Sequence, residues 1–312
     1  MATKYRVIAI FGPTAVGKTA VAVKLAELLR KHGYDPVAVS ADALQLYRGL
    51  EVLTGAPSAQ ERAALEHRLV GVADPADNYS AGRYATLAHA EIDRAVAAGR
   101  VPIVVGGTGL YLRAALSDLD LRPPTPPAVR ERLVAELKER GPLELHRRLS
   151  RLAPQVAARI APTDSQRVVR ALELLEVGEQ PPGEGRLWAA PPRHPTLLIG
   201  LTMARPLLYR RIDRRVEEMV RNGALDEVKR AREAGVSPTV EKALGFRELL
   251  AGDVEGMKRR TRQYAKRQLT WLRKLQGVVV IEVGEGEEGA VAARIAELFL
   301  AGAGHAPAAE RG

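Results

Sequence analysis

The sequence predicts an α/β fold, in which a parallel sheet is flanked by helices and an all-helical domain is inserted between two strands. Short, continuously apolar runs alternate with segments of helical spacing, a pattern typical of strands that are covered on both faces. Two proline-rich stretches, 122–127 and 179–195, enclose sequence with helical spacing only. Because proline interrupts both helices and strands, these stretches indicate the borders of an insertion.

The expected strands lie at 5–11, 36–41, 101–107, 196–202 and 277–283. Helical spacing is present at 17–32, at about 81–99 and from about 204 to 275. These elements divide the chain into a discontinuous core (1–121 and 196–285), a helical insertion (122–195), and a terminal helix with a disordered tail (286–312).

Composition narrows the classes of function. The chain has 312 residues and is 46% hydrophobic, which is enough for a packed core. It contains no cysteine, which excludes a disulfide framework and a thiolate nucleophile, and its histidines show no metal-ligand spacing. No secretory leader and no apolar run of about 20 residues is apparent, so we expect a cytoplasmic monomer without a membrane partner.

The net charge of +10 favours a polyanionic partner, of which nucleic acid is the commonest. The excess is concentrated between 204 and 275, where nineteen Lys/Arg face ten Asp/Glu. Within it, the segment 258–274 carries eight basic residues and no acidic one. Arg259, Arg262, Lys266 and Arg273 fall near helical spacing there, which predicts a basic stripe that contacts phosphates.

A phosphate-binding loop follows the first strand and gives the fold a P-loop NTPase-like character. The segment matches G-x-x-x-x-G-K-[ST] and consists of Gly12, Pro13, Thr14, Ala15, Val16, Gly17, Lys18 and Thr19. Backbone N–H groups and the helix N-terminus would hold phosphate oxygens. Lys18 adds a positive charge, and the Thr19 hydroxyl can bind Mg²⁺. The loop specifies a di- or triphosphate and leaves the reaction open.

Two further segments follow the carboxyl ends of predicted strands, at the edge where parallel sheets bind ligands. Asp42 follows the second strand and could be a Mg²⁺ ligand, a general base or the cap of the next helix, and the residues alone favour the cap. Gln45 could contact a base edge. Thr108, in GGTGLY (106–111), either brings a hydroxyl to the same crevice or belongs to an ordinary turn.

Five segments together resemble the bacterial tRNA dimethylallyltransferases of the IPP transferase family. GPTAVGKT, SADALQLY, GGTGLYL, DSQRVVRALE and KRQLTWLRK occur in this order, and the resemblance covers residues 5–283. It implies transfer of a dimethylallyl group from dimethylallyl diphosphate to N6 of adenosine 37, with release of diphosphate. It implies that Asp42 is the general base, that the loop and Mg²⁺ hold the diphosphate, and that Lys18, Thr19, Thr108 and Arg247 are further catalytic candidates.

The resemblance also implies a surface for the anticodon stem-loop of tRNA. Its expected members are Asp42, Ala43, Leu44, Gln45, Thr108, Arg130, Gln166, Arg167, Val168, Val169 and Arg170. On spacing alone, Arg167 and Arg170 share one helix face, which favours an ordinary exposed face. Ala43 replaces the serine that usually follows the aspartate in this family, and Phe246 replaces a common tyrosine.

Three other functions are compatible with parts of the sequence. The loop and Asp42 are compatible with a small-molecule kinase and with an adenylate isopentenyltransferase that acts on free AMP. The basic segment is compatible with a non-catalytic RNA-binding nucleotide switch. The basic helix and the insertion together favour the enzyme that acts on tRNA.

Overall fold

The computed structural model describes residues 4–122, 124–181, 187 and 190–302. The chain divides into two compact units, Met1–Leu119 with Trp188–Gly312, and Asp120–Leu187. The insertion expected from the proline-rich stretches, 122–195, begins two residues later and ends eight residues later than the second unit. Helix α15 (Glu288–Ala301) lies in the predicted terminal segment, and the tail expected to be disordered lies outside the described residues.

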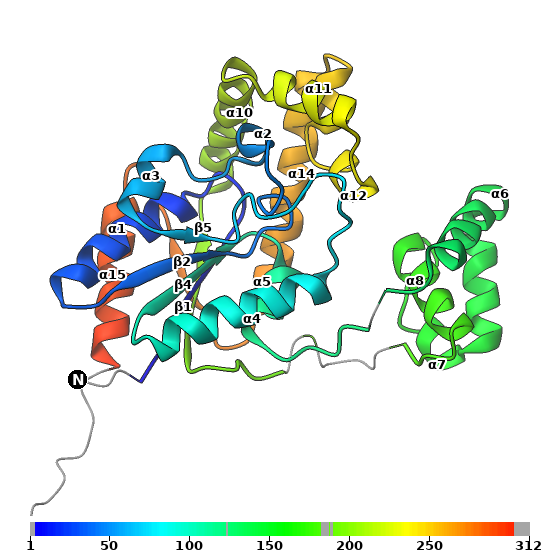
Figure 1. The fold of residues 1–312 in the computed structure, drawn as a ribbon, viewed down its shortest axis with the longest axis horizontal. Coiled ribbons are helices and arrows are strands. Elements are labelled where there is room, and N and C mark those ends of the chain that lie inside the picture. The colour runs from blue at the N-terminus through cyan, green and yellow to red at the C-terminus, as the bar shows by residue number, and fades with distance from the viewer. Residues whose placement is uncertain (1–3, 123, 182–186, 188–189, 303–312) are drawn as a thin grey trace, which may run out of the picture. The chain divides into compact units, whose positions relative to one another are not determined.

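The first unit is built on a parallel sheet of six strands, which confirms the predicted fold class (Figure 1). The strands are β1 (Val7–Phe11), β2 (Pro36–Ser40), β3 (His67–Arg68), β4 (Val101–Gly106), β5 (Thr196–Thr202) and β6 (Val279–Glu282). Their order in the sheet is β3-β2-β4-β1-β5-β6. Strand β3 was not expected, because two residues are too few to show a periodicity.

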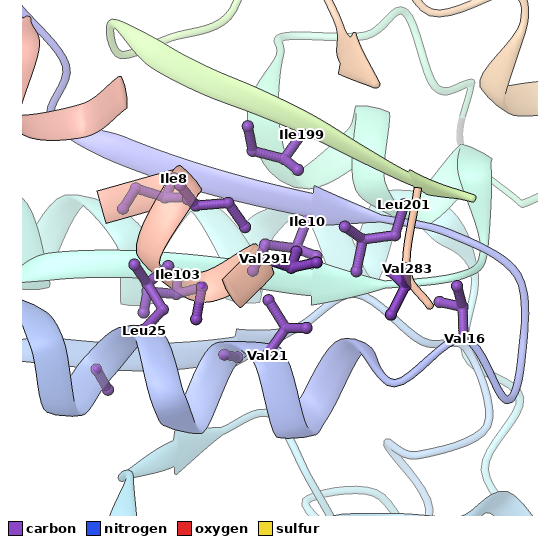
Figure 2. Close-up of a cluster of buried hydrophobic side chains, with 14 of the residues drawn as sticks. Ile8, Ile10, Val16, Val21, Leu25, Ile103, Ile199, Leu201, Val283 and Val291 are labelled. Carbon is purple, nitrogen blue, oxygen red and sulfur yellow. The ribbon is translucent and has the colours of Figure 1, made fainter. Parts of the chain in front are cut away.

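Helices cover both faces of this sheet (Figure 1). Helix α1 (Lys18–Lys31) packs with α15 on one face, and α4 (Ala81–Ala97) packs with α5 (Gly109–Leu116) on the other. Figure 2 shows Val21 and Leu25 of α1 facing Ile8 and Ile103 of the central strands, all of them buried. This close packing fixes the start of α1, and therefore the loop before it, against the ends of the strands.

The remaining helices of the first unit include those of the basic stretch between 204 and 275. They are α2 (Glu51–Thr54), α3 (Ala59–Ala64), α10 (Arg205–Arg221), α11 (Ala224–Ala234), α12 (Pro238–Glu241), α13 (Phe246–Leu250) and α14 (Val254–Leu272). Helices α10 and α14 pack against each other. None of the helices in the described part of the chain is long and apolar enough to cross a membrane.

The secondary structure described in the second unit is helical. Helix α6 (Pro127–Leu152) is interrupted at Gly141, which has a φ of 78° and precedes Pro142. The other helices described in this unit are α7 (Pro154–Ala157) and α8 (Ser165–Glu176). Its core consists of apolar side chains from α6, α7 and α8, including Leu133, Leu145, Leu149, Val168 and Leu172. This small core holds α8 against α6.

Candidate active site

A cavity of about 860 Å³ lies at the carboxyl ends of the strands, within the first unit. Its walls come from the phosphate-binding loop (residues 12–19), the end of β2, the turn after β4, and helices α10 and α14. Lys18, Asp42, Thr108, Arg215 and Tyr264 all line it. The structure therefore brings together segments that the sequence singled out separately, and adds Arg215, which it did not.

The phosphate-binding loop has the backbone conformation that an anion site needs. Gly17 has a φ of 97° and precedes α1, whose N-terminus has no side-chain cap. Ala15 also has a positive φ, 66°, which costs a non-glycine residue free energy and is maintained only when the surroundings fix it. Because no side chain caps α1, its first N–H groups can bind phosphate oxygens, assisted by the helix dipole.

Lys18 lies within this loop. Its Nζ donates to the carbonyl oxygens of Gly12 and Pro13, both at 2.9 Å. Burial and, secondly, repulsion from Arg215 lower the pKa of Lys18 from 10.5 to about 7, although attraction by Asp42 opposes both. The lysine is thus held in place before any anion binds, and its charge depends on conditions near neutral pH.

Arg215 is a site residue that the sequence analysis missed. It projects from α10 into the cavity, donates from Nη2 to the carbonyl oxygen of Gly55 at 3.2 Å, and has its pKa lowered chiefly by burial. One helical turn earlier, Arg211 lines the same cavity and pairs with Glu288 at 2.9 Å. The i, i+4 spacing of the two arginines was a usable signal, but α10 contains several other arginines.

Asp42 faces these cations. Its Oδ1 accepts a hydrogen bond from the N–H of Leu44 at 3.0 Å, which fixes the carboxylate at the end of β2. Residues 43–46 form a turn, and the next helix, α2, begins only at Glu51, so Asp42 caps a turn and not a helix. Its charge offsets part of the lowering of the Lys18 and Arg215 pKa values, which indicates that the carboxylate lies within electrostatic reach of both.

The residues after Asp42 line the cavity in different ways. Ala43 and Leu44 contribute to its wall. Gln45 also lines it, but its Oε1 accepts from the Ser40 hydroxyl at 2.9 Å and its Nε2 donates to the Gly55 carbonyl at 3.2 Å. The Gln45 amide therefore supports the loop around residue 55, and in this conformation its groups are occupied by the protein.

Thr108 is linked to α14 from the other side of the cavity. Its hydroxyl lies 3.2 Å from the Tyr264 hydroxyl. Burial, with a contribution from Asp42, raises the pKa of Tyr264 to about 12, so the phenol stays protonated at neutral pH. One turn later, buried Gln268 accepts from the N–H of Thr14 and donates to the carbonyl of Gly107, both at 2.8 Å. Helix α14 thereby connects the phosphate-binding loop to the turn that carries Thr108.

Arg247 does not lie in this site. It belongs to α13, is mostly exposed, pairs with Glu241 at 3.1 Å and is not among the residues that line the cavity. A side chain in this position would need to move before it could contact a diphosphate. Phe246 beside it is buried, with 1% of its surface exposed, and serves as a core residue.

The charges of α14 are more compensated than the run 258–274 suggests. Lys258, Arg259, Arg260 and Arg262 form ion pairs, which involve Glu217 and Glu255, Asp253, Glu248 and Asp213 respectively. The expectation of eight uncompensated charges was wrong, since acidic partners lie just before the run, at 248–255, and on α10. In the C-terminal half, Lys266, Arg267 and Arg273 stay exposed, and Arg267 stacks over the Tyr264 ring at 5.5 Å while lining the cavity.

In the second unit, the residues expected to contact tRNA fall into three groups. Gln166 and Arg167 are exposed at the start of α8. Val168 and Val169 are buried in the core of the unit, so their side chains cannot reach a ligand in this conformation. Arg130 and Arg170 both bind the carboxylate of Glu173.

Metal binding by protein groups alone is not supported. No group of three or more His, Asp or Glu side chains suited to a metal ion occurs among the residues that the structure describes. Thr19 lines the cavity beside the loop, where its hydroxyl could donate one oxygen ligand. A magnesium ion at this position would therefore take its other ligands from phosphate oxygens and water, which is its common mode in phosphate-binding loops.

Comparison with known proteins gives a consistent result. The chain matches the family model described as IPP transferase over residues 45–275 and the one described as isopentenyl transferase over 5–75. It is 43% identical over 279 residues to the tRNA dimethylallyltransferase of Thermobifida fusca, covering 86% of this chain and 87% of that one. It is 42% identical over 287 residues to the tRNA dimethylallyltransferase of Thermomicrobium roseum, covering 87% and 84%.

Solved structures agree. The tRNA isopentenylpyrophosphate transferase of Bacillus halodurans superposes with a TM-score of 0.67 at 33% identity, covering 96% of this chain and 98% of that one. A eukaryotic dimethylallyltransferase acting on tRNA superposes with a TM-score of 0.75 at 26% identity, covering 98% and 81%.

Proposed function

The chain belongs to the IPP transferase family, and on that premise we propose that it transfers a dimethylallyl group from dimethylallyl diphosphate to N6 of adenosine 37 in tRNA. It is an enzyme that attaches a prenyl group to tRNA. The observation that carries the finer proposal is the position of Asp42 in the same cavity as Lys18 and Arg215. The Asp42 carboxylate thus lines the same cavity as the cationic groups that suit a strongly charged anion.

The anion site suits a diphosphate that leaves. As the bond from C1 of the allyl group to the diphosphate oxygen breaks, negative charge builds on the diphosphate. Three kinds of group in fixed positions can stabilise that charge: the N–H groups at the start of α1, the ammonium of Lys18 and the guanidinium of Arg215. Apolar side chains also line the cavity, among them Leu53, Val216, Met219, Leu244 and Met257, and would accommodate a five-carbon unit.

Asp42 acts as the general base. An exocyclic amine is a weak nucleophile because its lone pair is delocalised into the purine ring. Removing the N6 proton as the new N–C bond forms offsets this weakness. The turn with Leu44 fixes the Asp42 carboxylate, and Thr108, held by Tyr264, presents a hydroxyl that can orient the reacting groups.

A magnesium ion would be held by Thr19 and the diphosphate oxygens. When bound, it would neutralise charge on the leaving group. The target base must leave the anticodon-loop stack to reach the Asp42 carboxylate within the cavity, as base-modifying enzymes require. Lys266, Arg267 and Arg273 would contact the RNA backbone near the cavity, and Arg167 would contact it from the second unit. We further expect a monomer that acts in the cytoplasm, where tRNA is abundant.

Mass spectrometry of an unmodified anticodon stem-loop, incubated with enzyme, dimethylallyl diphosphate and Mg²⁺, tests this function. We expect the mass of one five-carbon unit to appear on adenosine 37, and a stem-loop with guanosine at this position to gain none. Asp42→Asn should bind both substrates and form product at least about 100-fold more slowly. Absence of product with the unaltered protein, or labelled phosphate transferred from ATP to an acceptor, would refute the proposal.

A further inference from the structure

A fully buried carboxylate lies beneath two arginines in the helical unit. Glu173 of α8 has no exposed surface. Its Oε1 accepts from Nη1 of Arg130 at 2.8 Å, and its Oε2 accepts from Nη1 of Arg170 at 3.1 Å and from the Thr125 hydroxyl at 3.2 Å. Three chain segments therefore converge on one side chain: the stretch before α6, the first turns of α6, and α8.

Both arginines are bound by Glu173, yet their side chains remain partly exposed to solvent. Arg130 keeps 54% of its side chain exposed and Arg170 keeps 32%. Arg170 is also fixed at its other end, since its Nη2 donates to the carbonyl oxygen of Arg122 at 3.1 Å. An arginine has five N–H donors in a rigid fork, so binding Glu173 through one N–H leaves Arg130 able to bind a second anion.

We propose that Glu173 is a positioning residue for tRNA binding, which orients Arg130 and Arg170 so that together they grip a phosphate of the RNA backbone. The inference rests on the proposed function, because it takes tRNA as the substrate. A long arginine side chain loses conformational freedom when it binds a ligand, and fixing it beforehand reduces that loss. Glu173 is buried and therefore cannot contact the RNA itself, so it acts only through the two arginines.

A purely structural role would also account for a buried ion pair, and the two roles differ in the sign of one measurement. Glu173→Gln removes a negative charge, so bulk electrostatics predicts equal or tighter binding of the RNA polyanion. Loss of positioning predicts weaker binding, because the neutral amide holds the guanidinium groups less firmly than the carboxylate does.

The test measures the dissociation constant of a fluorescently labelled anticodon stem-loop, and steady-state kinetics of transfer, for Glu173→Gln. We expect the dissociation constant and the KM for tRNA to rise about tenfold, as for one weakened charge-assisted contact. The kcat and the KM for dimethylallyl diphosphate should stay unchanged. The logarithmic dependence of affinity on salt should become shallower by about one phosphate contact. Circular dichroism establishes that the variant is folded.

Glu176→Gln is the matched control. Glu176 also lies on α8 and also binds two arginines, Arg132 and Arg148, so its loss removes the same charge from the same unit. We expect its stem-loop affinity to equal or exceed that of the unaltered protein. Arg170→Lys, which keeps both the buried carboxylate and the positive charge but loses the planar fork, should weaken stem-loop binding as Glu173→Gln does.

In a protein that also carries Arg130→Gln and Arg170→Gln, Glu173→Gln should change stem-loop affinity no further, because nothing remains to be positioned. The inference is overturned if Glu173→Gln binds the stem-loop as tightly as the unaltered protein, or if both glutamate variants lose the same affinity. Either result leaves product formation by the unaltered protein intact, which separates failure of this inference from failure of the proposed function.

Discussion

Raising the pH from 7 to 9 should weaken the binding of dimethylallyl diphosphate in a way that depends on Lys18. In the ligand-free protein the pKa of Lys18 is lowered to about 7, first by burial and second by Arg215. Above this pH the amine is mostly neutral, whereas a bound diphosphate favours the ammonium and raises its pKa. Binding must then be accompanied by uptake of a proton, so affinity falls as pH rises.

The magnitude follows from the pKa. At pH 7 about half of the ligand-free molecules carry the charged lysine, and at pH 9 about one in a hundred does. If only the charged form binds, the dissociation constant should rise about 50-fold between the two pH values. Isothermal titration calorimetry at pH 7, 8 and 9, in buffers of different ionisation enthalpy, measures both the affinity and the number of protons taken up. At pH 9 this number should approach one.

Lys18→Arg supplies the control, because an arginine keeps its charge throughout this range. The phosphate groups of the ligand also titrate, near pH 6, and they do so equally with both proteins. The quantity of interest is therefore the pH dependence of the unaltered protein relative to that of Lys18→Arg. Equal pH dependence of the two proteins, with no proton uptake at pH 9, would refute the assigned role of the Lys18 charge.

Two further predictions concern the frame of the site and the second unit. Gly107→Ala would place a methyl group 2.2 Å from Nε2 of Gln268 and should lower the free energy of unfolding by about 1–3 kcal/mol. As a control, Gly289→Ala, whose new methyl group would meet only Lys24 at 3.8 Å, should be neutral or slightly stabilising. Denaturant titration measures the free energy of unfolding of both variants. Arg167→Ala should raise the KM for tRNA severalfold without changing diphosphate affinity, and an equal rise with exposed Arg147→Ala would assign the effect to general charge.

The sequence was most informative where a few consecutive residues determine both conformation and chemistry. The phosphate-binding loop could be predicted because its glycine, its lysine and the following helix are local features. The parallel sheet was predicted from apolar runs that are buried on both faces, and the family assignment from five segments in order was confirmed. Two-residue β3 offered no such pattern.

Features that depend on partners distant in sequence could not be predicted. Arg215 is one of several arginines in α10, and only the fold shows that it enters the cavity while Arg210 does not line it. In the same way, Arg262 of α14 forms an ion pair with Asp213 of α10, 49 positions away in the sequence. A count of charges along the chain cannot show which cations are already paired, and so it overestimated the basic surface of α14.

Helix α14 has two roles that its composition alone would not separate. On its outer side, Lys266 is exposed, as is Arg273 directly after its last residue. Its inward face fixes the active site, since Gln268 bridges Thr14 and Gly107. The ring of Trp271 approaches Gly109 so closely that a Cβ there would lie 2.1 Å from it. Changes on the outward face should therefore alter RNA affinity, whereas changes on the inward face should alter the rate of transfer, because both loops that hold the reacting groups rest on this helix.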